Sequence, residues 1–319
     1  MQDTHKTAVI FGGAGFIGRH LASYLLTLGY QVHVADLFSS NQESIEFIKC
    51  DVREEIKLNI DRGPELVFLL SAVHRSPGHH SDEYYETNVA GATNVTNWCN
   101  AVGACKIVFT SSIAVYGPGS EPKDEFSRLT PIHAYGKSKM LSENILKSWQ
   151  QEDSDARALV VCRPAVIFGP GEGGNFTRLA KALKYRMFFY PGGPSTVKSC
   201  GYVKDLVRSL VFVANQADKS ELTYNFCYPE SYSIGQICEA FHIVAGYARP
   251  FSLPIATIGN LLTHLPGPLS LVGARVLKLV LATKIVPTVL LNMNFVWESD
   301  LTSGLADWKV NSEKSGYFA

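Results

Sequence analysis

The stretch Thr7-Ala-Val-Ile-Phe11, followed directly by Gly12-Gly-Ala-Gly15-Phe-Ile-Gly18, decides the expected fold. The short apolar run predicts a buried strand, and the spaced glycines lead into a run of helical periodicity. In such a strand–turn–helix unit, Gly12 permits a tight turn, Gly15 lets the backbone approach a pyrophosphate, and Gly18 allows close contact between helix and strand. The anion then lies at a helix N-terminus, so the stretch predicts a dinucleotide site.

An acidic residue in register strengthens this prediction. Asp36 ends the second apolar run, eighteen residues after Gly18. A carboxylate at this point accepts hydrogen bonds from both ribose hydroxyls and repels a 2′-phosphate, and no Arg follows directly, so NAD is favoured over NADP. The other residues expected to line the cofactor are Phe16, Ile17, Asp51, Val52, Leu70, Ser71, Ala72, Asn88 and Pro164. Asp51 has a second interpretation, because an Asp that ends a strand is also an ordinary helix cap.

The first half of the chain alternates between strand and helix patterns. The expected strands are 7–11, 31–35, 45–49, 66–70, 106–110 and 158–162, and the longer segments 15–28, 82–101 and 135–150 carry apolar residues at helical spacing. Repeated βαβ units predict an α/β fold with a Rossmann-type, doubly wound parallel sheet. After Pro164 the alternation is lost and Gly/Pro-rich loops appear. We therefore expect a dinucleotide-binding domain over residues 1–164, with an approximate boundary because late elements interleave, and a smaller C-terminal substrate lobe over 165–319.

Composition excludes several classes of protein. The chain has 319 residues, with 29 Lys and Arg against 29 Asp and Glu, so its zero net charge gives no general attraction to nucleic acid. Seven scattered cysteines without a C-x-x-C pair favour neither a disulfide framework nor a zinc site, and no metal is expected. The polar N-terminus does not resemble a secretion signal. These features favour a cytoplasmic protein.

A second motif has the composition of a proton-transfer site. Tyr135 and Lys139 are four residues apart on an expected helix and hence on one face. A neighbouring positive charge favours the phenolate, so we expect the pKa of Tyr135 to fall below its usual value of about 10. Ser112 follows the expected strand 106–110, where its hydroxyl would share a substrate oxygen with the phenol.

Four motifs in this order resemble a known family. Residues 12–18, 109–117, Tyr135-x-x-x-Lys139 and 163–171 are similar to the extended short-chain dehydrogenase/reductases, the NAD-dependent nucleotide-sugar epimerase/dehydratase family, over about residues 7–245. The resemblance implies that Ser112 is the catalytic Ser/Thr, Tyr135 the proton-transfer residue, and Lys139 the residue that holds the nicotinamide ribose. It also implies hydride transfer from a sugar carbon to NAD, and a homodimer formed by the helices at 82–101 and 135–150.

The sequence partly indicates which reaction follows the hydride transfer. Dehydratases of this family carry an Asp-Glu pair just after the catalytic Ser/Thr, whereas this chain has Ile113-Ala114, and neither side chain moves a proton. The leading interpretation is a sugar 4-epimerase that acts on a diphospho-sugar through a transient 4-keto intermediate. The alternative is an NAD(P)H-dependent reductase of a nucleotide 4-keto-6-deoxy-sugar, because both need the same residues. A non-catalytic NAD-binding regulator is a third possibility, against which the intact Ser112, Tyr135 and Lys139 set speaks.

The substrate side resembles a narrower branch of the family. Segments 70–75, 84–89, 174–175 and 198–203 are similar to enzymes of surface-polysaccharide synthesis, such as that of O-antigen, including a polyprenyl-diphosphate N-acetylglucosamine 4-epimerase. This predicts substrate contacts from His74, Ser112, Asn175 and Lys198. Lys198 stands where the family commonly has an Arg, and supplies a point charge rather than a bidentate fork. Asn175 has a plain helix cap as its other interpretation.

The segment 253–291 invites a membrane interpretation. His264, Pro266 and Lys278 are among the residues that interrupt it, so no window reaches the roughly 18 apolar residues of a spanning helix. It is expected to be a buried cap of the substrate lobe, or else a peripheral contact with the inner face of the membrane that gives access to a lipid-linked sugar.

Overall fold

The computed structural model describes residues 6–39, 45–60, 63–74, 78–119, 121–190, 193–252, 282–312 and 318. Most of the segment 253–291 therefore lies outside the described residues. In the described part, no helix combines the length and apolar character needed to cross a membrane.

The main sheet has seven strands, all parallel. In spatial order they are β10 (Glu221–Phe226), β6 (Ala158–Pro164), β5 (Lys106–Thr110), β4 (Leu66–Leu69), β1 (Thr7–Phe11), β2 (Gln31–Asp36) and β3 (Glu46–Lys49). The order reverses between β1 and β4, and their carboxyl ends open the crevice in which doubly wound sheets bind ligands. The predicted fold class is confirmed.

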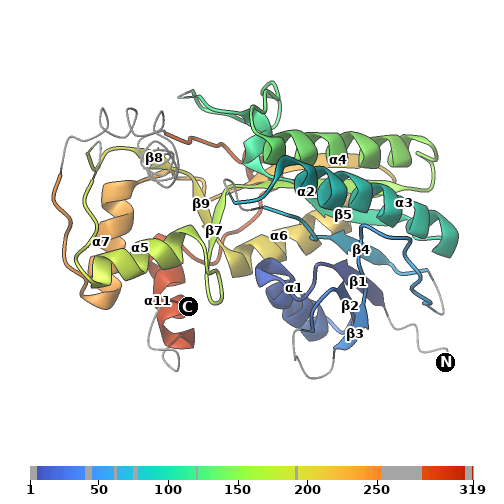
Figure 1. The fold of residues 1–319 in the computed structure, drawn as a ribbon, viewed down its shortest axis with the longest axis horizontal. Coiled ribbons are helices and arrows are strands. Elements are labelled where there is room, and N and C mark those ends of the chain that lie inside the picture. Colours follow the sequence, from blue (N-terminus) through green and yellow to red (C-terminus); the bar gives the residue numbers. More distant parts are fainter. Residues whose placement is uncertain are drawn as a thin grey trace.

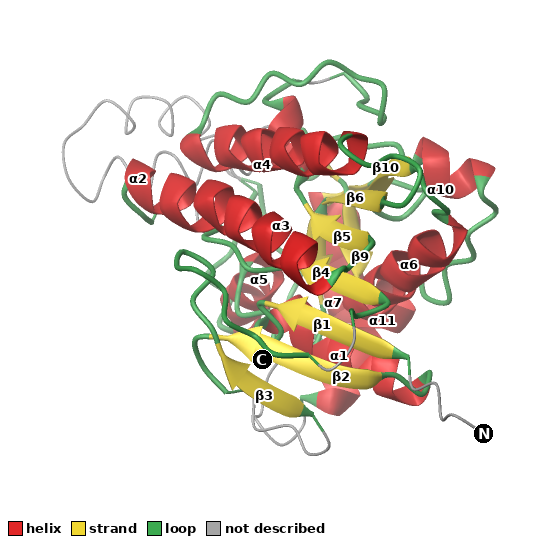
Figure 2. Cartoon of the chain, turned by 90° about the vertical axis from the view of Figure 1, so that its right-hand side faces the viewer, coloured by secondary structure: helices red, strands yellow, loops and turns green. Residues whose placement is uncertain are grey.

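Helices cover both faces of this sheet, as Figure 2 shows. One core lies under α3 (Gly91–Val102) and α4 (Ala134–Gln151), where the Trp98 ring packs edge-on against Phe11 at 5.3 Å between centroids and Trp149 belongs to the same buried cluster. The other core lies under α1 (Phe16–Thr27) and α6 (Val203–Gln216). Alternate residues of each strand face opposite cores, and continuous apolar runs are what a doubly covered strand requires. The two layers hold the strand ends rigidly in place.

The remaining elements extend from the carboxyl edge of the sheet (Figure 1). They are β7 (Val166–Phe168) paired with β9 (Cys200–Tyr202), β8 (Val197–Lys198) paired with β11 (Tyr232–Ser233), α5 (Asn175–Lys184), α7 (Ile234–Ala245) and α11 (Leu301–Asn311). The short helix α10 (Thr288–Asn292) packs instead beside β10 of the main sheet (Figure 2). An aromatic cluster around Phe168, which stacks on Phe176 at 4.7 Å between ring centroids, forms part of the core of this lobe. Two later elements are part of the sheet layer although they follow residue 164: β10 is a strand of the main sheet, and α6 packs on its face.

Two helical features differ from the expected boundaries. The segment expected as one helix from residue 82 to 101 is built from α2 (Ser81–Tyr84), a π-helical turn (Tyr85–Ala90) and α3. A short 3-10 turn (Ile113–Tyr116) follows Ser112. Single π turns inside helices often occur at functional sites, and this one carries Asn88.

Candidate active site

The glycine loop between β1 and α1 is shaped by close backbone contacts. Gly12 has φ +83°, and a Cβ there would lie 2.4 Å from the backbone nitrogen of Ser71. A Cβ at Gly18 would lie 2.5 Å from the carbonyl oxygen of Gly12, whereas at Gly15 its nearest neighbour would be 3.3 Å away. Gly12 and Gly18 thus allow the loop to fold tightly, and Gly15 leaves its outer side open. Within the described residues no side chain caps α1, so its first turn suits a pyrophosphate.

Asp36 closes the same loop from β2. Its Oδ2 accepts a hydrogen bond from the Ala14 backbone N–H at 3.0 Å, and its Oδ1 accepts one from Leu37 at 2.7 Å. These contacts fix the carboxylate beside the glycines, where the remaining lone pairs suit ribose hydroxyls. Phe16 and Ile17 form the first turn of α1 directly below.

The predicted adenine contacts lie after β3. Asp51 forms an ion pair with Arg53, Oδ2 to Nη2 at 2.6 Å, and hydrogen bonds from Arg53 lower the pKa of Asp51. Val52 is buried, and its carbonyl accepts from Asn94 Nδ2 at 2.9 Å. Val52 is thus part of the buried core under α3, and Asp51 has an ion-pair partner of its own.

The loop after β4 passes beside the glycine loop. The N–H groups of Leu70 and Ser71 both donate to the carbonyl of Phe11, at 2.8 and 2.9 Å, and Ala72 follows. Among the described residues, the buried Ser71 hydroxyl has no hydrogen-bond partner. A buried hydroxyl without a partner is costly, so this one fits a ligand in the groove.

Asn88 ties this loop to the catalytic helix. Its Oδ1 accepts from the backbone N–H of Val73 at 2.9 Å, and its Nδ2 donates to the carbonyl of Val73 and, at 2.8 Å, to Ser138 Oγ on α4. Asn88 is 3% exposed, and Ser142 of α4 donates to its carbonyl. The Asn88 amide thus joins the loop after β4 to α4, and its role behind the nicotinamide stays a prediction.

The structure brings Ser112 and Tyr135 together. The Ser112 hydroxyl lies close enough to the Tyr135 hydroxyl to lower its pKa, and the Tyr84 ring lies 6.2 Å from the Tyr135 ring. Ser112 accepts a hydrogen bond from the backbone N–H of Ala114 at 3.2 Å, which orients its hydroxyl at the start of the 3-10 turn. A serine and a phenol that lie side by side can share one substrate oxygen.

The pKa of Tyr135 does not fall as predicted from its spacing to Lys139. Burial raises the pKa of Tyr135, and the neighbouring Ser112 hydroxyl opposes this rise. Lys139 Nζ donates instead to the carbonyl of Thr110 at 2.8 Å and lies 4.7 Å from the centroid of the Phe109 ring. Burial lowers the pKa of Lys139 to about 7, opposed by Glu143. The four-residue spacing showed that Tyr135 and Lys139 share one face of the helix. It did not show that desolvation of the Tyr135 phenol affects its pKa more than the charge of Lys139 does.

Sequence reasoning missed a buried ion pair below the catalytic lysine. Glu143, one turn after Lys139 on α4, accepts from Arg163 Nη2 at 2.7 Å and Nε at 3.0 Å, and from Ser111 Oγ at 2.5 Å. Both side chains of the pair are almost fully buried. Arg163 also donates to the Tyr116 hydroxyl at 3.0 Å. A partial signal was available: Glu143 falls within the expected helix 135–150 and Arg163 directly follows the expected strand 158–162, and a charge buried at either place needs a partner.

The predicted substrate residues lie around the carboxyl edge. His74 is exposed at the end of the loop after β4, and its neighbour Arg75 lies outside the described residues. Lys198 is the last residue of β8, and its backbone forms an isolated parallel β-bridge with Thr283. Asn175 is the first residue of α5 rather than its cap, and its Oδ1 accepts from Arg178 at 2.8 Å.

The plain-cap interpretation of Asn175 is not found, because Glu172 performs that role. Its carboxylate accepts from the backbone N–H groups of Phe176, at 3.3 Å, and Thr177, at 2.9 Å. The positive end of α5 is thereby already matched by a negative charge.

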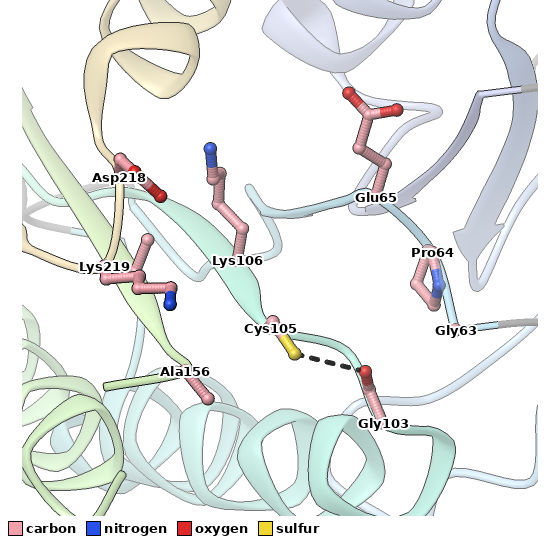
Figure 3. Close-up of a pocket in the computed structure, with 10 residues that line it drawn as sticks. Gly63, Pro64, Glu65, Gly103, Cys105, Lys106, Ala156, Asp218 and Lys219 are labelled. Carbon is pink, nitrogen blue, oxygen red and sulfur yellow. Dashed lines mark hydrogen bonds between the residues drawn. The ribbon is translucent and has the colours of Figure 1, made fainter. Parts of the chain in front are cut away.

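A separate hollow of about 350 Å³ lies at the opposite edge of the sheet, formed by residues that precede the strands (Figure 3). It is lined by Glu65, Lys106, Asp218, Lys219 and Cys105, whose thiol donates to the carbonyl of Gly103 at 3.5 Å. None of the predicted site residues lines this hollow. Parallel sheets bind ligands at their carboxyl edge, so the candidate active site is the one built on the glycine loop and α4.

The sheet order and the glycine loop with Asp36 are those of a dinucleotide-binding enzyme, and the neighbouring Ser112 and Tyr135 hydroxyls lie on the same chain. Residues 8–235 match the model of the NAD dependent epimerase/dehydratase family, and the chain belongs to that family. This confirms the predictions of an enzyme and of NAD as its cofactor.

Relatives of known activity agree with this assignment. The chain is 29% identical, over 84% of its length and 78% of the relative's, to N-acetyl-alpha-D-glucosaminyl-diphospho-ditrans,octacis-undecaprenol 4-epimerase of Escherichia coli O157:H7. It is 32% identical to UDP-glucose 4-epimerase 4 of Oryza sativa subsp. japonica, over 48% of this chain and 47% of that protein. The solved structure of MoeE5 in complex with UDP-glucose and NAD matches 97% of this chain and 99% of its own, with TM-score 0.78 and 22% identity. The chain is therefore similar to 4-epimerases, and its fold to a structure that holds NAD.

Proposed function

We propose that this protein is an NAD-dependent 4-epimerase of a diphospho-sugar. The neighbouring Ser112 and Tyr135 hydroxyls beside the buried Lys139, without a proton-transferring residue at Ile113 or Ala114, carry the proposal. This set removes and returns one hydroxyl proton, which epimerisation needs, and offers no second acid–base pair at these positions for dehydration.

The residues divide the work as follows. Tyr135 accepts the proton of the C4 hydroxyl and later returns it, while Ser112 holds the same oxygen. Lys139, fixed on the Thr110 carbonyl, orients the ribose of the cofactor. The glycine loop and Asp36 hold the pyrophosphate and the other ribose. NAD bound in this groove would supply a reversible hydride acceptor for C4, so that an epimerisation through a 4-keto-sugar would have no net redox change.

The proposed carrier is a polyprenyl diphosphate. The relative that acts on an undecaprenol-linked sugar matches this chain over most of its length, whereas the rice UDP-glucose 4-epimerase matches about half. We propose that the diphosphate lies near Lys198 and Asn175, between the sheet edge and the lobe built mainly from residues 165–319, with His74 at the sugar. The proposed role is the synthesis of a surface polysaccharide.

Cofactor dependence tests the proposal. Purified protein is incubated with polyprenyl-diphosphate N-acetylglucosamine, or with UDP-N-acetylglucosamine, and the gluco and galacto isomers are followed by NMR. The account expects interconversion without added cofactor, and NAD released on denaturation of the purified protein. No interconversion of these isomers, together with NADH- or NADPH-dependent reduction of a nucleotide 4-keto-6-deoxy-sugar, would instead identify the reductase.

We propose that two copies pair through α3 and α4. A groove of about 480 Å³ runs along both helices, lined by Thr96, Asn97, Leu141, Asn144 and Ser148 among others, and Leu141 is 39% exposed. Light scattering of the purified protein tests this: a dimer that Leu141→Arg converts to a monomer supports the pairing.

A further inference from the structure

Charge is distributed very unevenly along this electrically neutral chain. Residues 173–204 and 240–297 contain ten of its 29 Lys and Arg residues and none of its 29 Asp and Glu residues. The described helix α5 and the turn that follows it, from the first of these stretches, extend beyond the sheet edge (Figure 1). The rest of the molecule is correspondingly acidic, so a basic region is set apart on one lobe.

Part of this basic region is described in detail. On α5, Phe176, Thr177, Ala180 and Leu183 are buried, whereas Arg178, Lys181 and Lys184 are exposed. The turn that follows exposes Tyr185 (56%), Arg186 and Met187 (68%). We call the set Arg178, Lys181, Lys184, Tyr185, Arg186, Met187 and Phe251 the basic-aromatic face.

The apolar members of this face are held in place. Backbone N–H groups of Arg186 and Met187 donate to the carbonyls of Leu183 and Ala182, at 3.0 and 2.8 Å, and this closes the end of α5. Phe251, which is 61% exposed, lies with its ring 6.3 Å from that of Phe189, and its carbonyl accepts from the Tyr190 N–H at 3.0 Å. Large apolar side chains are thus fixed in solvent among cations, rather than folded into the core.

We propose that the basic-aromatic face docks on the surface of an anionic lipid bilayer. Cations attracted to anionic headgroups, with aromatic and Met side chains at the level of the interface, form the pattern of a peripheral membrane contact. Nucleic acid fits less well, because its phosphates would pair with the cations but offer no apolar surface against which Met187 could be buried.

Docking here deepens the proposed function and rests on it for its purpose. Helix α5 has ten residues, or about 15 Å of length, and the basic-aromatic face follows it from Arg178, one turn after Asn175, to the turn that ends at Met187. A diphosphate near Asn175 would then lie within one helix length of the headgroups. A polyprenyl tail could stay in the bilayer while the sugar reaches Tyr135.

Vesicle flotation tests the proposal directly. Full-length protein with its bound cofactor is mixed with phosphatidylglycerol–phosphatidylcholine vesicles or with pure phosphatidylcholine vesicles, at physiological salt. We expect flotation with the anionic vesicles only. Lys181→Glu/Lys184→Glu should weaken the partition at least roughly 25-fold, since each cation near the surface contributes about fivefold. Met187→Ser/Phe251→Ser should weaken it without a change of charge.

A matched control keeps the result interpretable. Lys6→Glu/Lys57→Glu makes the same change of charge at exposed positions near the sheet, and should float like the unmodified protein. Epimerisation of a soluble nucleotide sugar, measured in parallel, should be unchanged in all variants, so that failure of docking and failure of the proposed function are told apart. No flotation of the unmodified protein, equal losses in the control, or displacement by polyuridylate through the same lysines would overturn the proposal.

Discussion

Replacing Lys139 with Met should stabilise the protein by an amount that depends on pH. Lys139 is 2% exposed, and burial lowers its pKa from 10.5 to about 7. The unfolded chain keeps the ordinary pKa and therefore binds more protons than the folded protein between these values. The stability of the unmodified protein must then rise with pH through this window, while that of the variant lacks this contribution.

The magnitude follows from the shift. At 1.36 kcal/mol per pKa unit, the buried amine costs the folded state roughly 5 kcal/mol at pH 6 but only about 2 kcal/mol at pH 9. Loss of the hydrogen bond to the Thr110 carbonyl costs the variant about 1–3 kcal/mol at either pH. Lys139→Met should therefore be roughly 2–4 kcal/mol more stable than the unmodified protein at pH 6, and near parity at pH 9.

Urea unfolding measures this difference. Tryptophan fluorescence of both proteins, stripped of dinucleotide, gives the free energy of unfolding at pH 6 and pH 9. Lys57→Met, at an exposed position, serves as the control and should differ little from the unmodified protein at either pH. A stability difference for Lys139→Met that is the same at both pH values would refute the depressed pKa and the burial argument behind it.

Three further substitutions probe other parts of the site. Glu143→Gln should lower the free energy of unfolding by about 3–5 kcal/mol, measured in urea, because it leaves Arg163 buried without its counter-charge. Asp36→Asn should weaken NAD binding roughly 10–100-fold in calorimetry and narrow the preference for NAD over NADP, because a charged acceptor for the ribose is lost. Gly18→Ala should lower the free energy of unfolding by about 1–3 kcal/mol and reduce the NAD content of the purified protein, because the new Cβ would lie 2.5 Å from the Gly12 carbonyl oxygen.

Each of these has a control or a contrary outcome. Glu55→Gln removes an exposed partner of Lys57 and should change stability by less than about 1 kcal/mol; equal losses in Glu55→Gln and Glu143→Gln would contradict the buried-pair argument. Unchanged NAD affinity in Asp36→Asn would remove this carboxylate from the ribose site. Full NAD content in Gly18→Ala would show that the loop tolerates a methyl group.

The sheet was predictable from local pattern up to its sixth strand. The runs at 7–11, 31–35, 66–70, 106–110 and 158–162 are apolar because both of their faces are covered, and such continuous runs are the signal that sequence reasoning detects. Strand β10 lacks that signal. It contains Asn225, which is fully buried and accepts from the Tyr116 hydroxyl at 2.8 Å, a partner more than a hundred residues away in the chain.

The residues of the candidate site could be predicted from the sequence, but the pKa shifts of Tyr135 and Lys139 could not. Motif spacing identified Tyr135 and Lys139, and the structure brings Tyr135 to Ser112. Whether the ammonium lowers the phenol's pKa depends on the direction of Lys139 and on the depth of burial, which arise only when Phe109, Thr110 and Glu143 pack around it. Packing between residues far apart in the sequence decides such pKa shifts, and the spacing of residues on one helix does not reveal that packing.

The most direct test of the catalytic account is Tyr135→Phe. Turnover of the diphospho-sugar is followed by NMR, and bound NAD is measured by chromatography of the denatured protein. Because Phe keeps the ring but has no exchangeable proton, the account predicts a loss of turnover of roughly 100-fold to 10,000-fold, with the NAD content unchanged. Turnover within tenfold of the unmodified protein, at equal NAD content, would contradict it.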